Sequence, residues 1–162
     1  MNKESCKVIS ESLLKNKDMK LEEFYASRQR LEEGLAEFQN VFQIQQSLVK
    51  IDVSSNHSKR GLKQFLTGLA QCKNSIEYIN INNNRSINKS VGELENVIKT
   101  CHNLQYLNIS DLKMKKKYQK SICQAFVQSQ KEGSKLQELV WNYDLQCMIA
   151  EEFIKQLTEF NG

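Results

Sequence analysis

The sequence contains no proline and only six glycines in 162 residues. Both residue types mark turns and loops, so their scarcity favours a chain that is dense in helices and strands. The glycines are dispersed and none lies in a GxxxxGK pattern, so nucleotide binding through a phosphate loop has no support. Hydrophobic residues make up 40% and charged residues 26%, which is the composition of a folded globular domain.

Residues that commonly carry chemistry are also few, with two histidines and five cysteines. The cysteines form no CxxC pair, so we predict buried free thiols and neither a zinc site nor a redox motif. His57 and His102 fall in loops at opposite ends of the predicted helices, so we expect no shared catalytic site. Adjacent acidic pairs such as Glu22 and Glu23 point apart and are expected to be solvated. The sequence therefore predicts no enzyme, no metal and no cofactor.

Long apolar runs are absent as well. No run reaches the roughly 18 apolar residues that a membrane-spanning helix needs, so we expect no membrane association. The N-terminus lacks the apolar stretch of a secretory signal, which favours an intracellular protein, cytoplasmic or nuclear. The formal net charge of +4 is too small to indicate a nucleic-acid partner.

A segment of the form L-x-x-L-x-L-x-x-N recurs five times along the chain. This spacing is typical of a short strand that delivers alternate side chains to a core before the chain turns. The copies start at intervals of 27, 28, 28 and 32 residues, at Leu21, Leu48, Ile76, Leu104 and Leu136. They predict strands near 23–27, 50–54, 78–82, 106–110 and 138–142.

Between these strands, apolar residues recur every three or four positions, which indicates amphipathic helices. The predicted helices lie around 8–14, 35–42, 62–69, 91–98, 118–126 and 148–157. Each strand and helix can bury its apolar side only against neighbouring units, so the units must stack. We predict one α/β domain over 1–162, a leucine-rich repeat solenoid of the ribonuclease-inhibitor type with about five repeats. Its parallel strands would line the concave face and its helices the convex face.

The asparagine that ends the motif usually turns inward, where its amide bonds backbone groups of adjacent turns. Asn56 and Asn84 are predicted to do this. Gln29, Leu112 and Asp144 stand at the corresponding places of the other copies, so we expect the ladder of amides to be incomplete there.

Directly after the first predicted strand, Arg28-x-Arg30-Leu31-Glu32 is similar to the G-R-N-R-L-E element of Ran GTPase-activating proteins. Ser27 and Gln29 stand in place of that element's glycine and asparagine. Further on, the segment 79–84 (ININNN) resembles the INLNDN of the same family. The resemblance extends over nearly the whole chain and implies a leucine-rich repeat fold with a Ran-type small GTPase as a candidate partner.

The resemblance does not imply GTPase activation. In that family the arginine most needed for activation lies in repeats before the G-R-N-R-L-E element, and no position of this chain corresponds to it. For Arg28 and Arg30 the resemblance therefore implies at most a structural role or a contact with a partner.

Residues that alternate with the core positions of each strand should form columns across the concave face. The first column is Glu23, Lys50, Tyr78, Tyr106 and Glu138; the second is Tyr25, Asp52, Asn80, Asn108 and Val140; the third is Ser27, Ser54, Asn82, Ser110 and Asn142. Tyrosines among polar residues are a common interface composition, although solvent alone could face them. The predicted partner-binding residues are Tyr25, Arg28, Arg30, Lys50, Asp52, Tyr78, Asn80, Tyr106, Asn108, Lys115 and Lys116.

The densest charge cluster is the lysine run at 113–117, with Lys120 after it, in the loop and helix start that follow the fourth strand. Cations at a helix N-terminus oppose the helix dipole by up to about 1 kcal/mol. Two interpretations stay open, namely a docking site for an acidic partner and a solvated loop.

Two function classes follow from these observations. The first is a protein-interaction module that binds a small GTPase or another protein through the concave face and its loops. The second is a structural scaffold subunit of a larger assembly. Because neither terminus shows a polar cap, we expect Val8, Ile9, Leu157 and Phe160 to be partly exposed, with self-association or a neighbouring subunit at one end.

Overall fold

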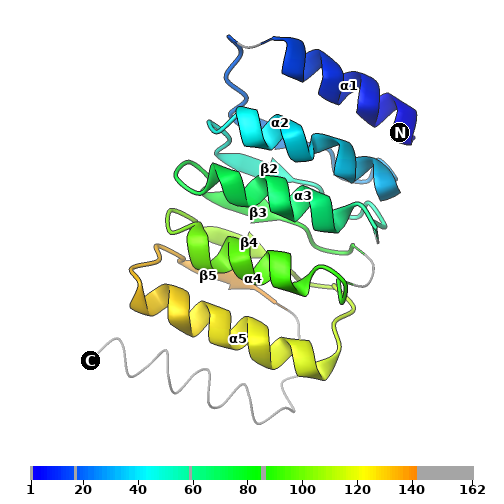
Figure 1. The fold of residues 1–162 in the computed structure, drawn as a ribbon. Coiled ribbons are helices and arrows are strands. Elements are labelled where there is room, and N and C mark those ends of the chain that lie inside the picture. The colour runs from blue at the N-terminus through cyan, green and yellow to red at the C-terminus, as the bar shows by residue number, and fades with distance from the viewer. Residues whose placement is uncertain (1, 17, 59, 85–86, 142–162) are drawn as a thin grey trace.

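The computed structural model describes residues 2–16, 18–58, 60–84 and 87–141. Strands and helices alternate along these residues, so the chain is α/β as predicted (Figure 1). The helices are α1 (Lys3–Lys15), η1 (Glu32–Phe38), α2 (Gln39–Ile44), α3 (Leu62–Leu69), η2 (Ala70–Cys72), α4 (Val91–Thr100) and α5 (Lys116–Lys131). The strands are β1 (Glu23–Tyr25), β2 (Lys50–Asp52), β3 (Tyr78–Asn80), β4 (Tyr106–Asn108) and β5 (Glu138–Val140).

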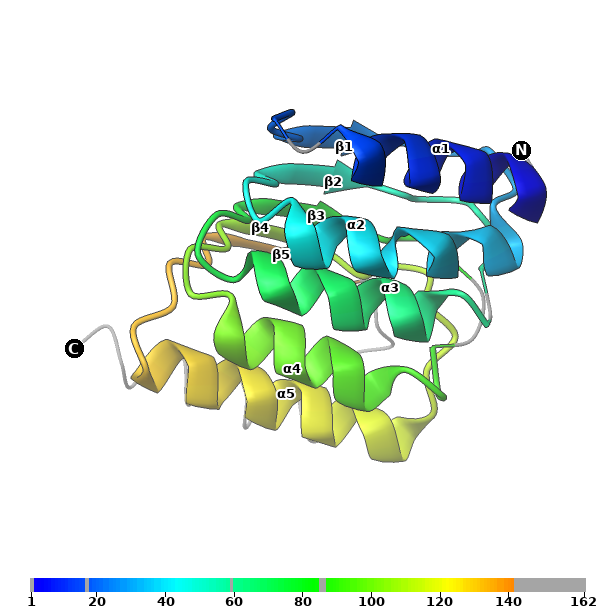
Figure 2. The same ribbon diagram turned by 45° about the horizontal axis from the view of Figure 1, so that its top comes forward.

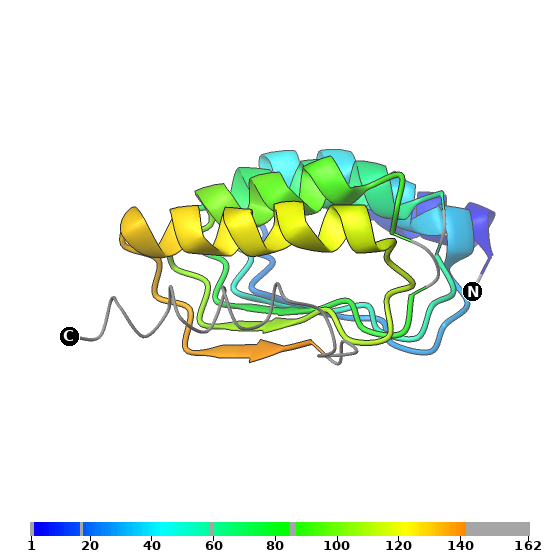
Figure 3. The same ribbon diagram turned by 90° about the horizontal axis from the view of Figure 1, so that it is seen from below.

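The five strands form one parallel sheet in the order β1-β2-β3-β4-β5. The helices lie side by side in a second layer over one face of this sheet (Figure 2). In the view along the layers, no helix of the described residues lies over the other sheet face (Figure 3). Each strand-and-helix unit therefore packs mainly on the units before and after it, as the repeat pattern predicts.

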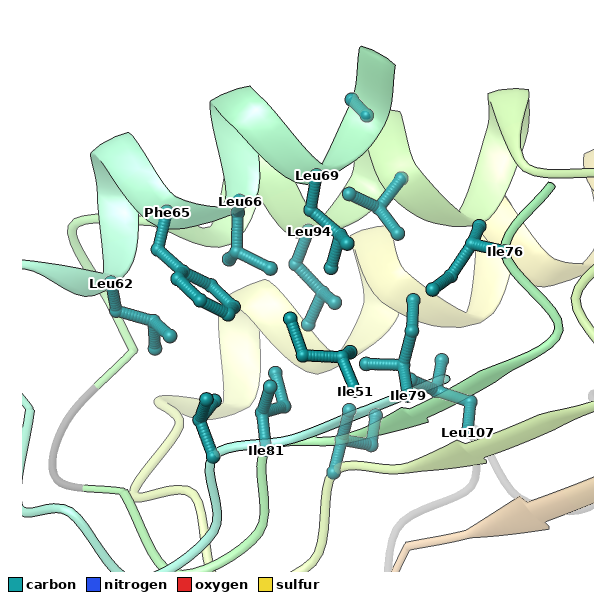
Figure 4. Packing of buried hydrophobic residues seen from close by; sticks show 14 of the residues in the cluster. Ile51, Leu62, Phe65, Leu66, Leu69, Ile76, Ile79, Ile81, Leu94 and Leu107 are labelled. Atoms are coloured by element: carbon teal, nitrogen blue, oxygen red, sulfur yellow. The ribbon is translucent and has the colours of Figure 1, made fainter. Parts of the chain in front are cut away.

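The core lies between the sheet and the helix layer. The middle residues of three adjacent strands, Ile51, Ile79 and Leu107, stand in register and are fully buried (Figure 4). On the helix side of the core, the buried Phe65 and Leu69 of α3 lie one turn apart and point towards the sheet. Burying a side chain of this size stabilises the fold by about 1.5–3 kcal/mol, so these contacts hold the two layers together.

The helical segment that follows β1 differs from the predicted amphipathic helix over 35–42. The chain there forms the 3-10 helix η1 before it continues as α2. Phe38 and Phe42 on these two elements pack against Phe24 of β1, with ring centroids 4.7 Å and 5.9 Å from it. Aromatic packing thus fixes the unit at the N-terminal end of the sheet, where α1 also covers it through Cys6 and Ser10.

The strands are shorter than predicted, with three residues instead of five. At the end of β2 the Asp52 carboxylate accepts a hydrogen bond from the backbone N–H of Ser54, at 2.9 Å. Such a bond to the residue two positions ahead turns the chain out of the extended conformation. Backbone bonding between units nevertheless continues past the strand ends, because the Arg28 N–H donates to the Ser54 carbonyl at 3.0 Å.

The predicted asparagine ladder is present at Asn56 and Asn84, and at Leu112 it is interrupted as expected. Asn56 and Asn84 are buried, and their amides donate to backbone carbonyls of their own unit and of the preceding one. At the next such place Leu112 has no amide to offer. Asn88 bonds this loop instead, accepting from the Lys115 N–H at 2.9 Å and donating to the Lys113 carbonyl at 3.2 Å.

The scaffold hypothesis predicts partly exposed apolar residues at the two ends of the row of strand-and-helix units. Val8 and Ile9 on α1 are 55% and 39% exposed, as predicted. The predicted helix over 148–157 and the residues Asn142, Asp144, Leu157 and Phe160 lie outside the described residues. Among the helices that the structure describes, none is both long and apolar enough to cross a bilayer.

Candidate protein-binding surface

The sheet face opposite the helix layer carries the two columns of side chains that the strand period predicts. The register aligns Glu23, Lys50, Tyr78, Tyr106 and Glu138 in the first column, and Tyr25, Asp52, Asn80, Asn108 and Val140 in the second. We call these ten residues the open face. The third predicted column, from Ser27 to Ser110, falls in the turns beyond the strand ends.

The centre of the open face is a stacked pair of tyrosines. The rings of Tyr78 and Tyr106 have centroids 4.3 Å apart and planes inclined by only 4°. Burial raises the pKa of Tyr78 to about 12, and the adjacent Tyr106 and Asp52 add to this effect. The Tyr78 phenol therefore stays neutral at physiological pH and presents a flat aromatic surface with a polar tip.

Tyr25 lies two strands from Tyr78 in the second column and is 60% exposed. Partial desolvation raises the pKa of its phenol, and the negative charge of Glu23 acts in the same direction. A large aromatic side chain left this open at the edge strand adds apolar area to the open face.

The polar residues of the second column are already engaged within the protein. Asp52, Asn80 and Asn108 each accept a hydrogen bond from the backbone N–H two residues ahead, at 2.9, 3.2 and 3.1 Å. The Asn80 amide also donates to the Asp52 carboxylate at 3.0 Å, and the Asn108 amide donates to the Tyr106 hydroxyl at 3.3 Å. Their first role is thus to shape the strand ends and to position the residues beside them.

The charged residues at the β1 edge of the first column pair with each other. The Lys50 ammonium lies 3.5 Å from the Glu23 carboxylate, and both side chains are about half exposed. Exposed pairs of this kind contribute little to stability, about 0–1 kcal/mol, so Lys50 and Glu23 remain available to a partner.

Arg28 and Arg30 are exposed in the turn after β1, and both have positive φ angles, 57° and 53°. The same left-handed conformation recurs one unit apart at Ser55, Asn83 and Asp111. Ser, Asn and Asp tolerate this conformation, so their recurrence at corresponding places is a sequence signal that could have predicted the turn. An arginine there is held against its own backbone preference.

The predicted site residues do not all come together. Lys115 and Lys116 lie at the start of α5, in the segment that follows β4, whereas Arg28 and Arg30 follow β1, three strands away. The structure thus gathers the tyrosines, Asp52 and the asparagines on one face, and it leaves the two basic pairs apart from each other, one after β1 and one at the start of α5.

No family model matches this sequence, and no curated protein matches it.

The cysteines and histidines of the described residues do not form a shared reactive group. Burial raises the pKa of the Cys72 thiol to about 12 and that of Cys101 to about 11, so both remain protonated and unreactive. His102 has its Nε2 atom 2.8 Å from the Lys99 carbonyl oxygen. His57 lies exposed in the turn after β2, on another unit. Among the described residues no cluster of three or more metal-ligating side chains occurs.

Proposed function

We propose that this chain is a leucine-rich repeat solenoid of the ribonuclease-inhibitor type that binds a partner protein through its open face. The observation that carries the proposal is the stacked pair Tyr78 and Tyr106, displayed on a sheet face that no described helix covers. Tyrosines are enriched at the centres of protein interfaces, where a rigid ring offers contact area at a small entropic cost.

The arrangement of the units supports the solenoid. Parallel strands in consecutive order, each joined to the next by a helix on the same side, are what a repeat of about 28 residues produces. Buried Asn56 and Asn84 bond across unit boundaries, as the repeat motif requires. Both features come from residues at fixed places in the repeat and so favour a repeat architecture over a doubly wound sheet.

The favoured partner class is a Ran-type small GTPase, on the resemblance of the Arg28–Glu32 segment and of Ile79–Asn84 to Ran GTPase-activating proteins. Arg28 and Arg30 are exposed at the rim of the open face, where they could contact a protein that covers the tyrosines. A fluorescence-anisotropy titration with a GTP-loaded Ran-type GTPase tests this. We expect saturable binding at or below micromolar concentration, and binding only above that range would count against this partner.

GTPase activation is a separate property, and we propose that the chain lacks it. No residue of this sequence corresponds to the arginine that the resemblance makes essential. In a multiple-turnover GTP hydrolysis assay we expect the same rate with and without the protein. Acceleration that disappears when Arg28 or Arg30 is replaced by alanine would overturn this.

A scaffold role is the second candidate function, and exposed apolar residues of the helix layer favour it. Ile44 at the end of α2 is 60% exposed, and Val8 and Ile9 lie open on α1. If this end is covered by a second copy or a neighbouring subunit, sedimentation velocity should show concentration-dependent association that Val8→Ser weakens. A strictly monomeric profile at high concentration would argue against self-association.

A further inference from the structure

The open face has a charge opposite to that of the protein as a whole. It carries three carboxylates, from Glu23, Asp52 and Glu138, and one ammonium, from Lys50, which gives a net charge of −2. The complete chain has a net charge of +4. A partner that docks on this face therefore meets an acidic, aromatic surface on a basic protein.

The negative charge that is not compensated lies around the tyrosine pair. Lys50 is paired with Glu23 at 3.5 Å, which leaves Asp52 and Glu138. Asp52 stands one strand before Tyr78 and is fixed by its bonds to the Ser54 N–H and the Asn80 amide. Glu138 is exposed, stands directly beside Tyr106 in the first column, and forms no ion pair with any other described residue.

The geometry of the stack determines which side of the Tyr106 ring Tyr78 leaves uncovered. Tyr78 and Tyr106 stand on adjacent strands with nearly parallel rings, so each covers one side of the other. The second side of the Tyr106 ring is turned away from Tyr78, in the direction of β5. Glu138 pairs with Tyr106 in the strand register, so a carboxylate-bearing side chain neighbours this side of the ring.

On this basis, which rests on the proposed function, we propose that the open face recognises an arginine side chain of its protein partner. The guanidinium stacks on the side of the Tyr106 ring that Tyr78 does not cover, and it donates to the Glu138 carboxylate in an ion pair. Asp52 supports the same positive charge from the other side of the tyrosine pair.

Arginine fits this position better than lysine does. The guanidinium is planar and weakly hydrated, so it can lie flat on a ring while its N–H groups donate in a fork to a carboxylate. A lysine ammonium is a compact and strongly hydrated charge that would satisfy Glu138 but gain less from the ring. The site should therefore distinguish the two cations, which a purely acidic patch would not do.

The test uses the full chain and three short peptides, acetyl-Gly-Arg-Gly-amide and its lysine and citrulline analogues, in ¹⁵N NMR titrations. Citrulline keeps the shape of arginine without its charge. We expect the arginine peptide to shift the amide signals of Tyr106 and Glu138, the lysine peptide to bind several-fold more weakly, and the citrulline peptide to bind at least about tenfold more weakly. Affinity should fall as salt is raised.

Three variants locate the site. Tyr106→Leu should weaken the arginine peptide about tenfold, whereas Tyr106→Phe, which keeps the ring, should bind like the parent protein. Glu138→Gln should reduce the preference for arginine over citrulline, and because Glu138 is exposed this variant keeps its fold. Glu95→Gln on α4, in the helix layer, removes the same charge away from the site and should change nothing.

The inference is overturned if arginine and citrulline peptides bind equally, if neither binds, or if Glu138→Gln and Glu95→Gln behave alike. These outcomes are separate from failure of the proposed function. If binding of a protein partner still requires Tyr78 and Tyr106 while the peptides show no preference for arginine, only the proposal of an arginine site is contradicted. If the arginine peptide binds but no GTPase does, the proposed partner class is wrong, whereas the open face remains supported as a binding surface.

Discussion

The Asn56 side chain donates a hydrogen bond to the Ala26 carbonyl oxygen of the preceding unit, at 2.7 Å. The same amide donates to the Val53 carbonyl at 2.9 Å, and its oxygen accepts from the Gln29 N–H at 2.9 Å and the Leu31 N–H at 3.2 Å. One buried side chain thus satisfies backbone groups of two successive turns. Together with the backbone bonds from the Arg28 N–H to the Ser54 carbonyl and from the Glu32 N–H to the Asn56 carbonyl, the amide links the first two units.

Replacing Asn56 with alanine should destabilise the protein by about 2–4 kcal/mol, because several buried backbone groups lose their partners at once. Urea denaturation followed by circular dichroism measures this. Asn40→Ala, on the exposed side of α2, is the matched control and should change the free energy of unfolding by no more than about 0.5 kcal/mol. Equal effects of the two variants would show that the Asn56 bonds contribute nothing.

The positive φ angle of Arg28 gives a prediction about the turn after β1. Arg28→Gly should be more stable than Arg28→Ala by about 1 kcal/mol, because both variants lose the side chain but only glycine is unstrained at φ 57°. Thermal denaturation of the two variants decides this. If the glycine variant melts at the same temperature as the alanine variant or lower, the turn does not have the conformation described.

Replacing either of two helical glycines with alanine should change the stability of the protein, in opposite directions at the two positions. A Cβ at Gly68 in α3 would lie 2.6 Å from the Gln39 carbonyl oxygen and 2.8 Å from the Gln39 Cα, whereas a Cβ at Gly92 in α4 meets nothing within 4 Å. Backbone atoms cannot move aside without separating α3 from α2. Gly68→Ala should therefore cost about 1–3 kcal/mol, and Gly92→Ala should stabilise the protein by about 0.5–1 kcal/mol.

Both glycine variants are measured by the same denaturant titration. A neutral Gly68→Ala variant would contradict the close approach of the two helices. A destabilising Gly92→Ala variant would contradict the open position of Gly92.

The tyrosine stack predicts a loss of stability at alkaline pH. The pKa of Tyr78 is about 12 in the folded protein, above the value near 10 of an unfolded tyrosine. The stabilisation that comes from the neutral Tyr78 phenol is therefore complete below about pH 10 and is lost as the pH rises towards 12. Ultraviolet titration of phenolate should show a tyrosine that titrates late, near pH 12, and that is absent in Tyr78→Phe. In Tyr106→Phe it should titrate earlier, and an unchanged late phase in both variants would contradict the assignment.

Much of this fold follows from residue spacing alone. The places of Ile51, Ile79 and Leu107 were predictable because a strand with one buried face must alternate, and a regular repeat then aligns the strands. The columns of the open face follow from the same alternation. Asn56 and Asn84 were predictable because an amide carries two N–H donors and a carbonyl acceptor, and can therefore bond several backbone groups of adjacent turns at once.

Other features depend on local turn chemistry that spacing does not reveal. Asp52, Asn80 and Asn108 were expected to face a partner, and the structure shows them bonded to the turn two residues ahead. The left-handed conformation at Arg28 could not be read from an arginine, which rarely adopts it. The stacking of Tyr78 on Tyr106 needs the ring orientations, and neighbouring places in a sheet do not determine these.

The most direct test of the open face as a protein-binding surface is the dissociation constant of the GTP-loaded Ran-type GTPase, measured by anisotropy for two variants. Tyr78→Ala combined with Tyr106→Ala removes the stack, and Ile44→Ala removes an exposed apolar side chain from the helix layer. With circular dichroism showing both folded, we predict that the double variant binds at least about tenfold more weakly while Ile44→Ala binds like the parent protein. An unchanged dissociation constant for the double variant, or a larger loss for Ile44→Ala, would contradict the account.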